Sequence, residues 1–141
     1  MGTYRGELRP APFGLAVFVD FDAKLYPFKK LKAREVVNDH FRNHPITVAY
    51  FPDSNTAVAW NRRVHGRPLT FDWSDRRDES GLLLLEDQET GSRWSAMTGI
   101  ALSGELKGQQ LAPLQYYPIL IDRFYAFFPK AAVFSSKPLE R

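Results

Sequence analysis

The stretch that decides the fold covers residues 82–99 and reads LLLLEDQETGSRWSAMTG. A continuous apolar run meets a polar turn, and the chain then returns through Arg93-Trp94-Ser95, which predicts a strand, a short hairpin loop and a partner strand. We expect Gly91 to take the positive φ of a bulged hairpin loop, and Asp87 and Thr90 to hydrogen-bond the nearby backbone. Four leucines are too few to cross a membrane, so we expect this strand to be covered on both faces.

The composition is that of an ordinary globular domain with an unusual share of aromatic rings. At 141 residues the chain is long enough for one domain with a sizeable core. Eleven Phe, six Tyr and three Trp predict a core packed largely by rings. The absence of cysteine excludes disulfides, thiolate nucleophiles and cysteine zinc sites. A net charge of +3 permits weak attraction to anionic partners without requiring it.

The chain shows one domain flanked by short ends. We expect an N-terminal arm at residues 1–12, a single β-rich globular domain at 13–136 and a C-terminal tail at 137–141. The apolar segment 13–19 is too short for a signal peptide, and we expect no membrane span. The protein would then be cytoplasmic if the chain is complete, and exported if a leader has been removed.

Short apolar runs bounded by turn residues predict most of the strands. These are expected at residues 15–19, 25–28, 46–51, 56–60, 69–73 and 82–85, with shorter ones at 93–95, 100–102, 105–106, 110–111 and 132–134. Pro27 lacks an amide donor, so the second strand should be short or lie at a sheet edge. The segment 74–80 is expected to be a charged loop.

Two segments carry apolar residues at helical spacing. The first predicts a helix at residues 31–41, ended by Asn43 and Pro45, and the second predicts a helix at residues 119–128, ended by Pro129. Together with the strands they predict a mostly-β (β-rich α+β) domain. Its antiparallel sheet should be barrel- or sandwich-like and should carry two short helices.

A set of short motifs between about residues 19 and 135 has the order of a known family. They are Tyr26-Pro27, Glu35-Val36-Val37-Asn38-Asp39, Tyr50 with Pro52, Gly66 with Leu69 and Phe71, Asp87 through Ser95, Thr98-Gly99, Gly104, Gly108 and Leu111. In combination they resemble DUF3179, a family of uncharacterised bacterial domains whose members are often exported. The resemblance implies a neighbourhood of fold and no particular reaction.

The chain departs from the family pattern at two places. The resemblance implies a Cys-Pro-x-Cys segment after Tyr50 and, commonly, a histidine before Glu35. Here residues 51–54 read Phe-Pro-Asp-Ser, and Arg34 occupies the histidine position. Two thiols and an imidazole would suit a soft metal or a redox pair, whereas phenylalanine, serine and arginine suit neither. We therefore expect that any such site has been lost, and we expect no metal and no cofactor.

The expected first helix would bring polar groups onto one face. Glu35, Asn38 and Asp39 are spaced i, i+3 and i+4, so they could form a general acid–base pair or a hard-cation site. Alternatively, Asn38 and Asp39 close the helix while Glu35 pairs with Arg62 or Arg93. We favour this structural interpretation because capping and ion pairing are the usual roles of such residues.

An enzyme remains the alternative function. Ser54, Ser92 and Ser95 are possible nucleophiles, but none lies in a nucleophile-elbow motif. The enzyme hypothesis takes Glu35, Asp39 and Ser92 as catalytic candidates, with Asn38, Tyr50, Arg62 and Trp94 as binding residues.

Two weaker signals point to metal and to nucleic acid. His40 and His44 are four residues apart, but Pro45 argues against a helix through them, and we expect no metal site. Basic clusters at 29–34, 62–67 and 76–77, interleaved with aromatic residues, could bind nucleic acid. Since acidic residues nearly balance them, we expect a solvated face and keep weak nucleic-acid or anion binding as a third hypothesis.

The segment 119–128 is apolar nearly all round. Such a helix needs cover from its own core or from a partner, and an exposed apolar patch would mark an interface. Plain core packing is the alternative. We expect a non-catalytic binding or assembly module on a β-rich scaffold. Its protein partner, or a second copy, should dock through Ile121, Phe124, Tyr125 and Phe128.

Overall fold

A computed structural model describes residues 12–135. Its strands are β1 (Phe13–Val19), β2 (Asp22–Pro27), β3 (Val36–Phe41), β4 (His44–Phe51), β5 (Thr56–Asn61), β6 (Arg63–Val64), β7 (Arg67–Pro68), β8 (Phe71–Arg77), β9 (Leu83–Asp87), β10 (Arg93–Trp94), β11 (Ala101–Ser103), β12 (Ala112–Pro113), β13 (Gln115–Leu120) and β14 (Ala132–Val133). Its helices are α1 (Phe28–Ala33) and α2 (Ile121–Phe127).

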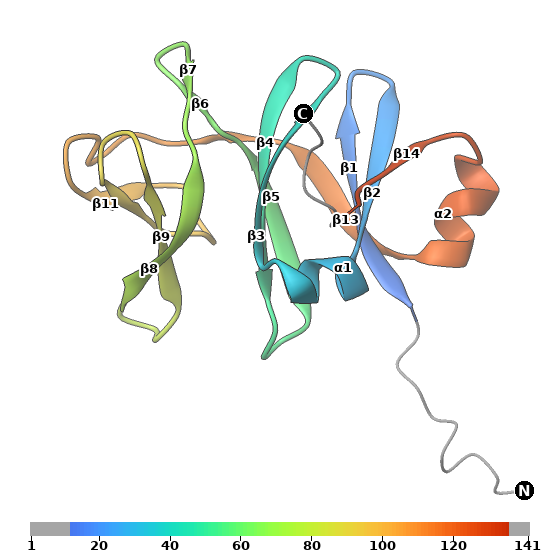
Figure 1. The fold of residues 1–141 in the computed structure, drawn as a ribbon, viewed down its shortest axis with the longest axis horizontal. Coiled ribbons are helices and arrows are strands. Elements are labelled where there is room, and N and C mark those ends of the chain that lie inside the picture. The colour runs from blue at the N-terminus through green and yellow to red at the C-terminus, as the bar shows by residue number, and fades with distance from the viewer. Residues whose placement is uncertain (1–11, 136–141) are drawn as a thin grey trace, which may run out of the picture.

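The elements are arranged in layers (Figure 1). From right to left in that view lie α2, the sheet β13-β1-β2-β14, the sheet β12-β5-β4-β3 and the sheet β11-β10-β9-β8. Pairing is antiparallel except between β14 and β2, and none of these sheets closes on itself within residues 12–135. The prediction of a mostly-β, sandwich-like fold with two short helices is confirmed.

Strand β4 occupies the middle of the stack and is buried on both faces. Ile46, Val48 and Tyr50 pack into one core, between the middle sheet and the sheet of β1 and β2. Ala49 and Phe51 pack into the other core, between the middle sheet and the sheet of β8 and β9. Each of these cores contains several buried rings, Tyr26, Phe28 and Tyr50 in the first and Phe51, Phe71 and Trp94 in the second. A third, smaller cluster around Phe124 lies under α2.

The hairpin predicted from residues 82–99 is present as β9, a tight loop and β10. Gly91 has a φ of +73°, and the amide and hydroxyl of Thr90 donate to Asp87 Oδ1 over 2.6 and 2.9 Å. Leu84 and Leu85 point to opposite faces and are both buried, so the centre of the strand is covered on both sides as expected.

The prediction of a helix at residues 31–41 is wrong. Helix α1 ends at Ala33, and residues 36–41 form β3, paired with β4. Arg42 and Asn43 have φ values of +52° and +65° and close a two-residue hairpin turn, a conformation that favours asparagine. The pairing buries Val36 and Val37 in separate cores, so tertiary burial outweighs the helical spacing of the apolar residues.

Smaller differences concern the ends of elements. The second helix is confirmed, but residues 119–120 belong to β13. Strand β8 extends to Arg77, into the expected charged loop, and residues 105–106 lie in a turn. Strand β2 lies between β1 and β14 and not at the edge of its sheet. Strand β14 pairs only with Lys24 and Leu25, so Pro27, which lacks an amide hydrogen, has no partner strand on that side.

The chain ends are outside this description. Apart from Pro12, the expected arm at 1–12 and the tail at 137–141 lie outside the described residues. Neither helix within residues 12–135 has the length and apolarity needed to cross a bilayer.

Candidate binding groove between two edge strands

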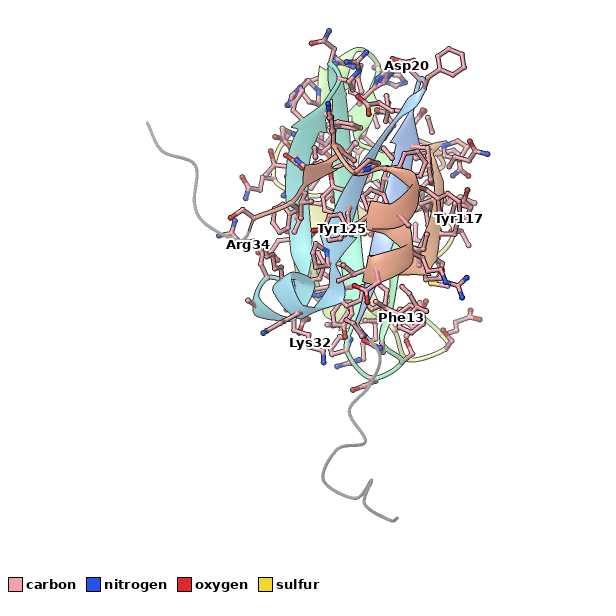
Figure 2. All side chains as sticks on the ribbon, turned by 90° about the vertical axis from the view of Figure 1, so that its right-hand side faces the viewer. Phe13, Asp20, Lys32, Arg34, Tyr117 and Tyr125 are labelled. Carbon is pink, nitrogen blue, oxygen red and sulfur yellow. The ribbon has the colours of Figure 1, made fainter. Side chains whose placement is uncertain are left out.

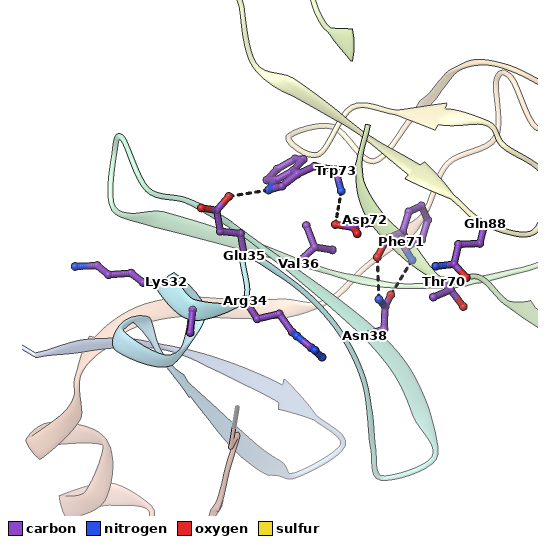
Figure 3. A pocket seen from close by; sticks show the side chains of 11 residues that line it. Lys32, Arg34, Glu35, Val36, Asn38, Thr70, Phe71, Asp72, Trp73 and Gln88 are labelled. Carbon is purple, nitrogen blue, oxygen red and sulfur yellow. Dashed lines mark hydrogen bonds between the residues drawn. The ribbon is translucent and has the colours of Figure 1, made fainter. Parts of the chain in front are cut away.

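A groove of about 520 Å³ opens between β3 and β8 (Figure 3). This volume lies within the range of roughly 300–1,000 Å³ that is typical of ligand sites. Both strands are at the edge of their sheets. The groove is lined by the C-terminal end of α1, the first half of β3, the start of β8 and one residue of the β9–β10 loop. The lining residues are Lys32, Ala33, Arg34, Glu35, Val36, Asn38, Thr70, Phe71, Asp72, Trp73 and Gln88.

Asn38 joins the two strands across the groove. Its Nδ2 donates to the carbonyl oxygen of Phe71, and its Oδ1 accepts from the amide of Phe71, each over 2.9 Å. A side-chain amide carries one donor and one acceptor side by side, so it can replace the missing neighbour strand of an edge residue. Asn38 therefore lines the groove and also fixes the distance between the two sheets.

Glu35 is also tied to β8. Its Oε1 accepts a 3.0 Å hydrogen bond from Trp73 Nε1, which holds the indole beside the groove. The backbone carbonyl of Glu35 accepts from the amide of Tyr50. Burial raises the pKa of Tyr50, and the charge of Glu35 raises it further. The phenol donates to Asn55 Oδ1 over 2.5 Å in the β4–β5 turn, so Tyr50 is a structural donor within the core.

The side chain of Asp39 lies on the other side of the middle sheet, toward β2. Its Oδ2 accepts from Lys24 Nζ over 2.7 Å and from Tyr26 Oη over 2.8 Å. Burial, and then the charge of Asp39, raise the pKa of Tyr26, so this phenol stays protonated and donates. Because residues 36–41 form a strand, Glu35 and Asp39 do not share a helical face, and they have separate partners in different sheets.

Arg62 lies between the sheets and holds main-chain carbonyls. Its Nε donates to Ile46 O over 3.1 Å, Nη1 to Leu69 O over 2.9 Å and Nη2 to Asp39 O over 3.1 Å. Burial lowers the pKa of this guanidinium, and the charge of Asp39 opposes that shift. Arg62 joins three segments and does not line the groove.

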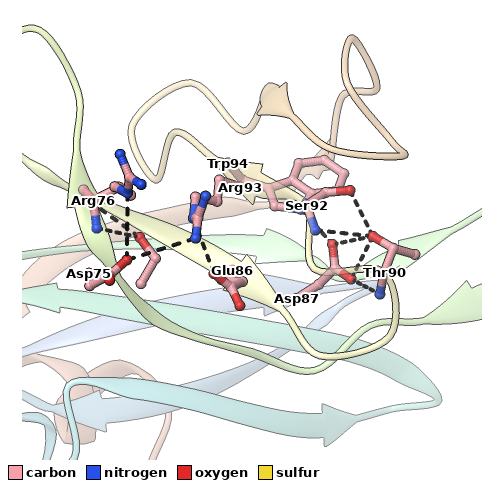
Figure 4. A network of polar contacts seen from close by, with 9 residues as sticks. Asp75, Arg76, Glu86, Asp87, Thr90, Ser92, Arg93 and Trp94 are labelled. Carbon is pink, nitrogen blue, oxygen red and sulfur yellow. Dashed lines mark hydrogen bonds and ion pairs between the residues drawn. The ribbon is translucent and has the colours of Figure 1, made fainter.

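Ser92 and Trp94 belong to a buried network around Asp87 (Figure 4). Trp94 Nε1 donates to Asp87 Oδ2 over 2.8 Å. Ser92 Oγ accepts from the amide of Leu106 over 2.9 Å and is bonded to Thr90 Oγ1 over 2.7 Å. Asp87, Ser92 and Trp94 are all 0% exposed, so the serine hydroxyl is closed off from solvent.

The structure thus divides the residues that the sequence singled out. Glu35 and Asn38 line the groove, whereas the other candidates lie elsewhere in the fold. Those outside it are Asp39, Tyr50, Arg62, Ser92 and Trp94.

Sequence reasoning missed the two cations of the groove. Lys32 and Arg34 are exposed, and within residues 12–135 neither side chain forms a hydrogen bond or ion pair. They were expected to belong to a solvated basic face. The signal that could have found them is their position just before an edge strand, and it is visible only once β3 is recognised as a strand.

The pairing of β3 with β4 ends beside the positions where the family resemblance implies reactive residues. Val36 pairs with Ala49, and the amide of Tyr50 donates to the carbonyl of Glu35. Arg34 lies before this pairing, where its amide donates to the carbonyl of Leu31 at the end of α1, and Phe51 is the last residue of β4. Among the described residues no group of three His, Asp or Glu side chains is arranged to hold a metal ion.

These features define a layered β-sheet module with a polar groove between two edge strands. The comparison with family models agrees with this: residues 6–141 match DUF3179, described as a protein of unknown function, and the chain belongs to this family. Searches of curated proteins and of solved structures returned no match.

Proposed function

We propose that this chain is a non-catalytic binding module that associates with a second copy of itself through the outer side of α2 and β13. The observation that carries the proposal is that three rings on and beside α2, those of Tyr117, Tyr125 and Phe127, are exposed; we call them the aromatic face (Figure 2 labels both tyrosines). These side chains are 53%, 42% and 70% exposed. Exposed rings gathered in one region are typical of interaction sites.

Ring contacts beneath the surface connect the two tyrosines of the aromatic face. The ring of Phe18 lies 5.1 Å from that of Tyr117 and 5.7 Å from that of Phe128. Phe124 continues the chain, at 5.3 Å from Phe128 and 6.0 Å from Tyr125. Tyr117 and Tyr125 are therefore held in place by Phe18 and Phe124, which lowers the entropy cost of docking.

The inner side of α2 is already covered. Phe124 is fully buried against Ala16, Ala23 and Leu25, and Ile121 and Phe128 are half-buried around it. Of the interface residues expected from the sequence, Tyr125 alone is exposed. Tyr117 and Phe127 take the place of the others in the proposed contact.

The charges beside the aromatic face favour a second copy as its occupant. Asp122, Arg123 and Lys130 are exposed, and within the described chain none of them forms an ion pair. A two-fold interface places a patch against itself, so a rim with both signs of charge can pair its acid with the base of the other copy.

The contacts of the catalytic candidates support a module without catalysis. Glu35 accepts from Trp73, Asp39 accepts from Lys24 and Tyr26, and Ser92 is enclosed between Thr90 and Leu106. We infer that these side chains have structural roles, since each of them is held by a hydrogen-bond partner within the fold.

Sedimentation equilibrium over a wide concentration range tests the proposal. We expect the wild-type chain to dimerise, and we expect the double variant Tyr125→Ser, Phe127→Ser to weaken dimerisation at least about tenfold. The matched control is Leu102→Ser, because Leu102 is 43% exposed in β11, in the sheet at the opposite end of the molecule from α2 (Figure 1). A wild-type monomer at every concentration, or equal weakening in the control, would contradict the proposal.

A further inference from the structure

The outer edge of β3 exposes main-chain groups at alternate residues. The bond from the amide of Tyr50 to the carbonyl of Glu35 fixes the pairing, so residues 35, 37 and 39 direct their main-chain groups toward β4. Val36, Asn38 and His40 therefore direct theirs outward, away from the sheet. This edge runs along the groove.

Most neighbouring outward groups are capped by side chains. The amide of His40 donates to Asp39 Oδ1 and that of Trp73 to Asp72 Oδ1, each over 2.8 Å. Phe71 is held at both its amide and its carbonyl by Asn38. Capping of this kind protects an edge strand from pairing with another chain.

Val36 and Asn38 are the exception. Their main-chain amides and carbonyls have no hydrogen-bond partner among the described residues. Two residues spaced i and i+2 with free groups on the same side offer the repeat that an added strand pairs with. The open part of the edge is the part that lines the groove.

The charges around the groove define what the added strand should carry. Lys32 and Arg34 stand beside it as exposed cations without ion-pair partners in the described chain. The two acids of the groove are each engaged at one oxygen by Trp73, Glu35 through the indole and Asp72 through the main-chain amide. Among the described residues the two cations are therefore the charged groups of the groove that no other group engages.

We propose that the groove binds an extended acidic peptide, which adds to β3 as a strand. Its main chain pairs with Val36 and Asn38, and its carboxylates, at every second position, meet Lys32 and Arg34. Main-chain bonds would supply affinity, and the two cations would select acidic side chains. This site lies on β3 and β8 and does not depend on the aromatic face of α2.

Amide chemical shifts of the full chain test the strand pairing directly. The probe is an end-blocked peptide of about eight residues that alternates threonine and glutamate, long enough to pass the open edge. We expect the amide signals of Val36 and Asn38 to shift on titration, with the capped amide of His40 much less affected. Titration that leaves both amides unchanged would overturn the proposal.

Changes in the peptide separate main-chain pairing from charge without altering the protein. A peptide N-methylated at alternate amides, and one with lysine in place of glutamate, should each bind at least about tenfold more weakly. Equal binding of the N-methylated peptide would overturn strand addition. Competition by glutarate as effective as that by the peptide would reveal a small dicarboxylate site instead, and would also overturn it.

Changes in the protein test the two cations. We expect the double variant Lys32→Glu, Arg34→Glu to bind the acidic peptide at least about tenfold more weakly than the wild-type chain does. Lys107→Glu is the matched control, because Lys107 is exposed in the turn after β11 and does not line the groove. Unchanged affinity in the double variant, or the same loss in the control, would contradict the proposed selectivity.

Discussion

Asn38 holds the amide and the carbonyl of Phe71 with two hydrogen bonds of 2.9 Å. The two residues are 33 positions apart and lie in different sheets. Phe71 is only 2% exposed, so its main-chain groups would not easily find water as a replacement. This contact therefore joins the middle sheet to the sheet of β8 and shapes the groove between them.

Removing this contact should be costly. We expect Asn38→Ala to lower the free energy of unfolding by about 2 kcal/mol, since it leaves two buried groups unpaired. Urea unfolding measures the change. Asn61→Ala is the control, because Asn61 accepts one exposed bond from Arg63. A loss no larger than that of the control would show that water replaces Asn38.

The carboxylate of Asp87 should not be replaceable by an amide. It accepts from Thr90 and from Trp94 while 0% exposed. In Asp87→Asn an amide would face one of these donors, and we expect a loss of about 2 kcal/mol in urea unfolding. Asp75→Asn, at a side chain that is 85% exposed, should change stability by less than about 0.5 kcal/mol. Equal effects of the two variants would rule out this role for Asp87.

Arg62 should not be replaceable by lysine. Its guanidinium reaches three carbonyls at once, whereas an ammonium group on a different stem cannot match that geometry. We expect Arg62→Lys to lower the free energy of unfolding by about 2–3 kcal/mol. The neighbouring exposed Arg63, with one 3.4 Å bond to Gly66, supplies the control Arg63→Lys. Similar stabilities of the two variants would count against the role assigned to Arg62.

Glu89 should make stability depend on pH in the acid range. Partial burial raises its pKa, but hydrogen bonds from the amide and hydroxyl of Thr70, and the charge of Arg67, outweigh that, and the pKa lies below its ordinary value. A carboxylate whose pKa is lower when folded stabilises the fold above the unfolded pKa of about 4.3, and this contribution is lost as the pH falls through the folded pKa.

The comparison of wild type with Glu89→Gln checks this expectation. We expect the variant to be less stable by about 1 kcal/mol near neutral pH, and the difference to shrink at about pH 2.5. Glu79→Gln is the control, because Glu79 is exposed and its side chain has no hydrogen bond within the described chain. A difference that stays constant down to the acid limit would refute the linkage.

The sequence could predict elements whose signals lie within a few residues. The hairpin at residues 82–99 formed as expected because Asp87, Thr90 and Gly91 interact with one another over four positions. The second helix was found because its apolar run is short and Pro129 follows it. The predicted helix at residues 31–41 failed because its apolar spacing fits a helix and a doubly buried strand alike.

The candidate site could be predicted only in part. Glu35 and Asn38 were singled out by their residue types, but their partners Trp73 and Phe71 come from a strand more than thirty residues away. No local pattern indicates which sheet a carboxylate will face, and Asp39 therefore could not be assigned to Lys24 and Tyr26 in advance.

By itself the sequence determined the mostly-β class, the ring-rich core, the tight β9–β10 hairpin and the absence of cysteine chemistry, because composition and turn residues act locally. Only the tertiary structure decided that residues 36–41 form an edge strand, which carboxylates are engaged, and where exposed rings and free main-chain groups remain. Those outcomes depend on which distant segments are packed together, and packing is the property that a short stretch of chain does not contain.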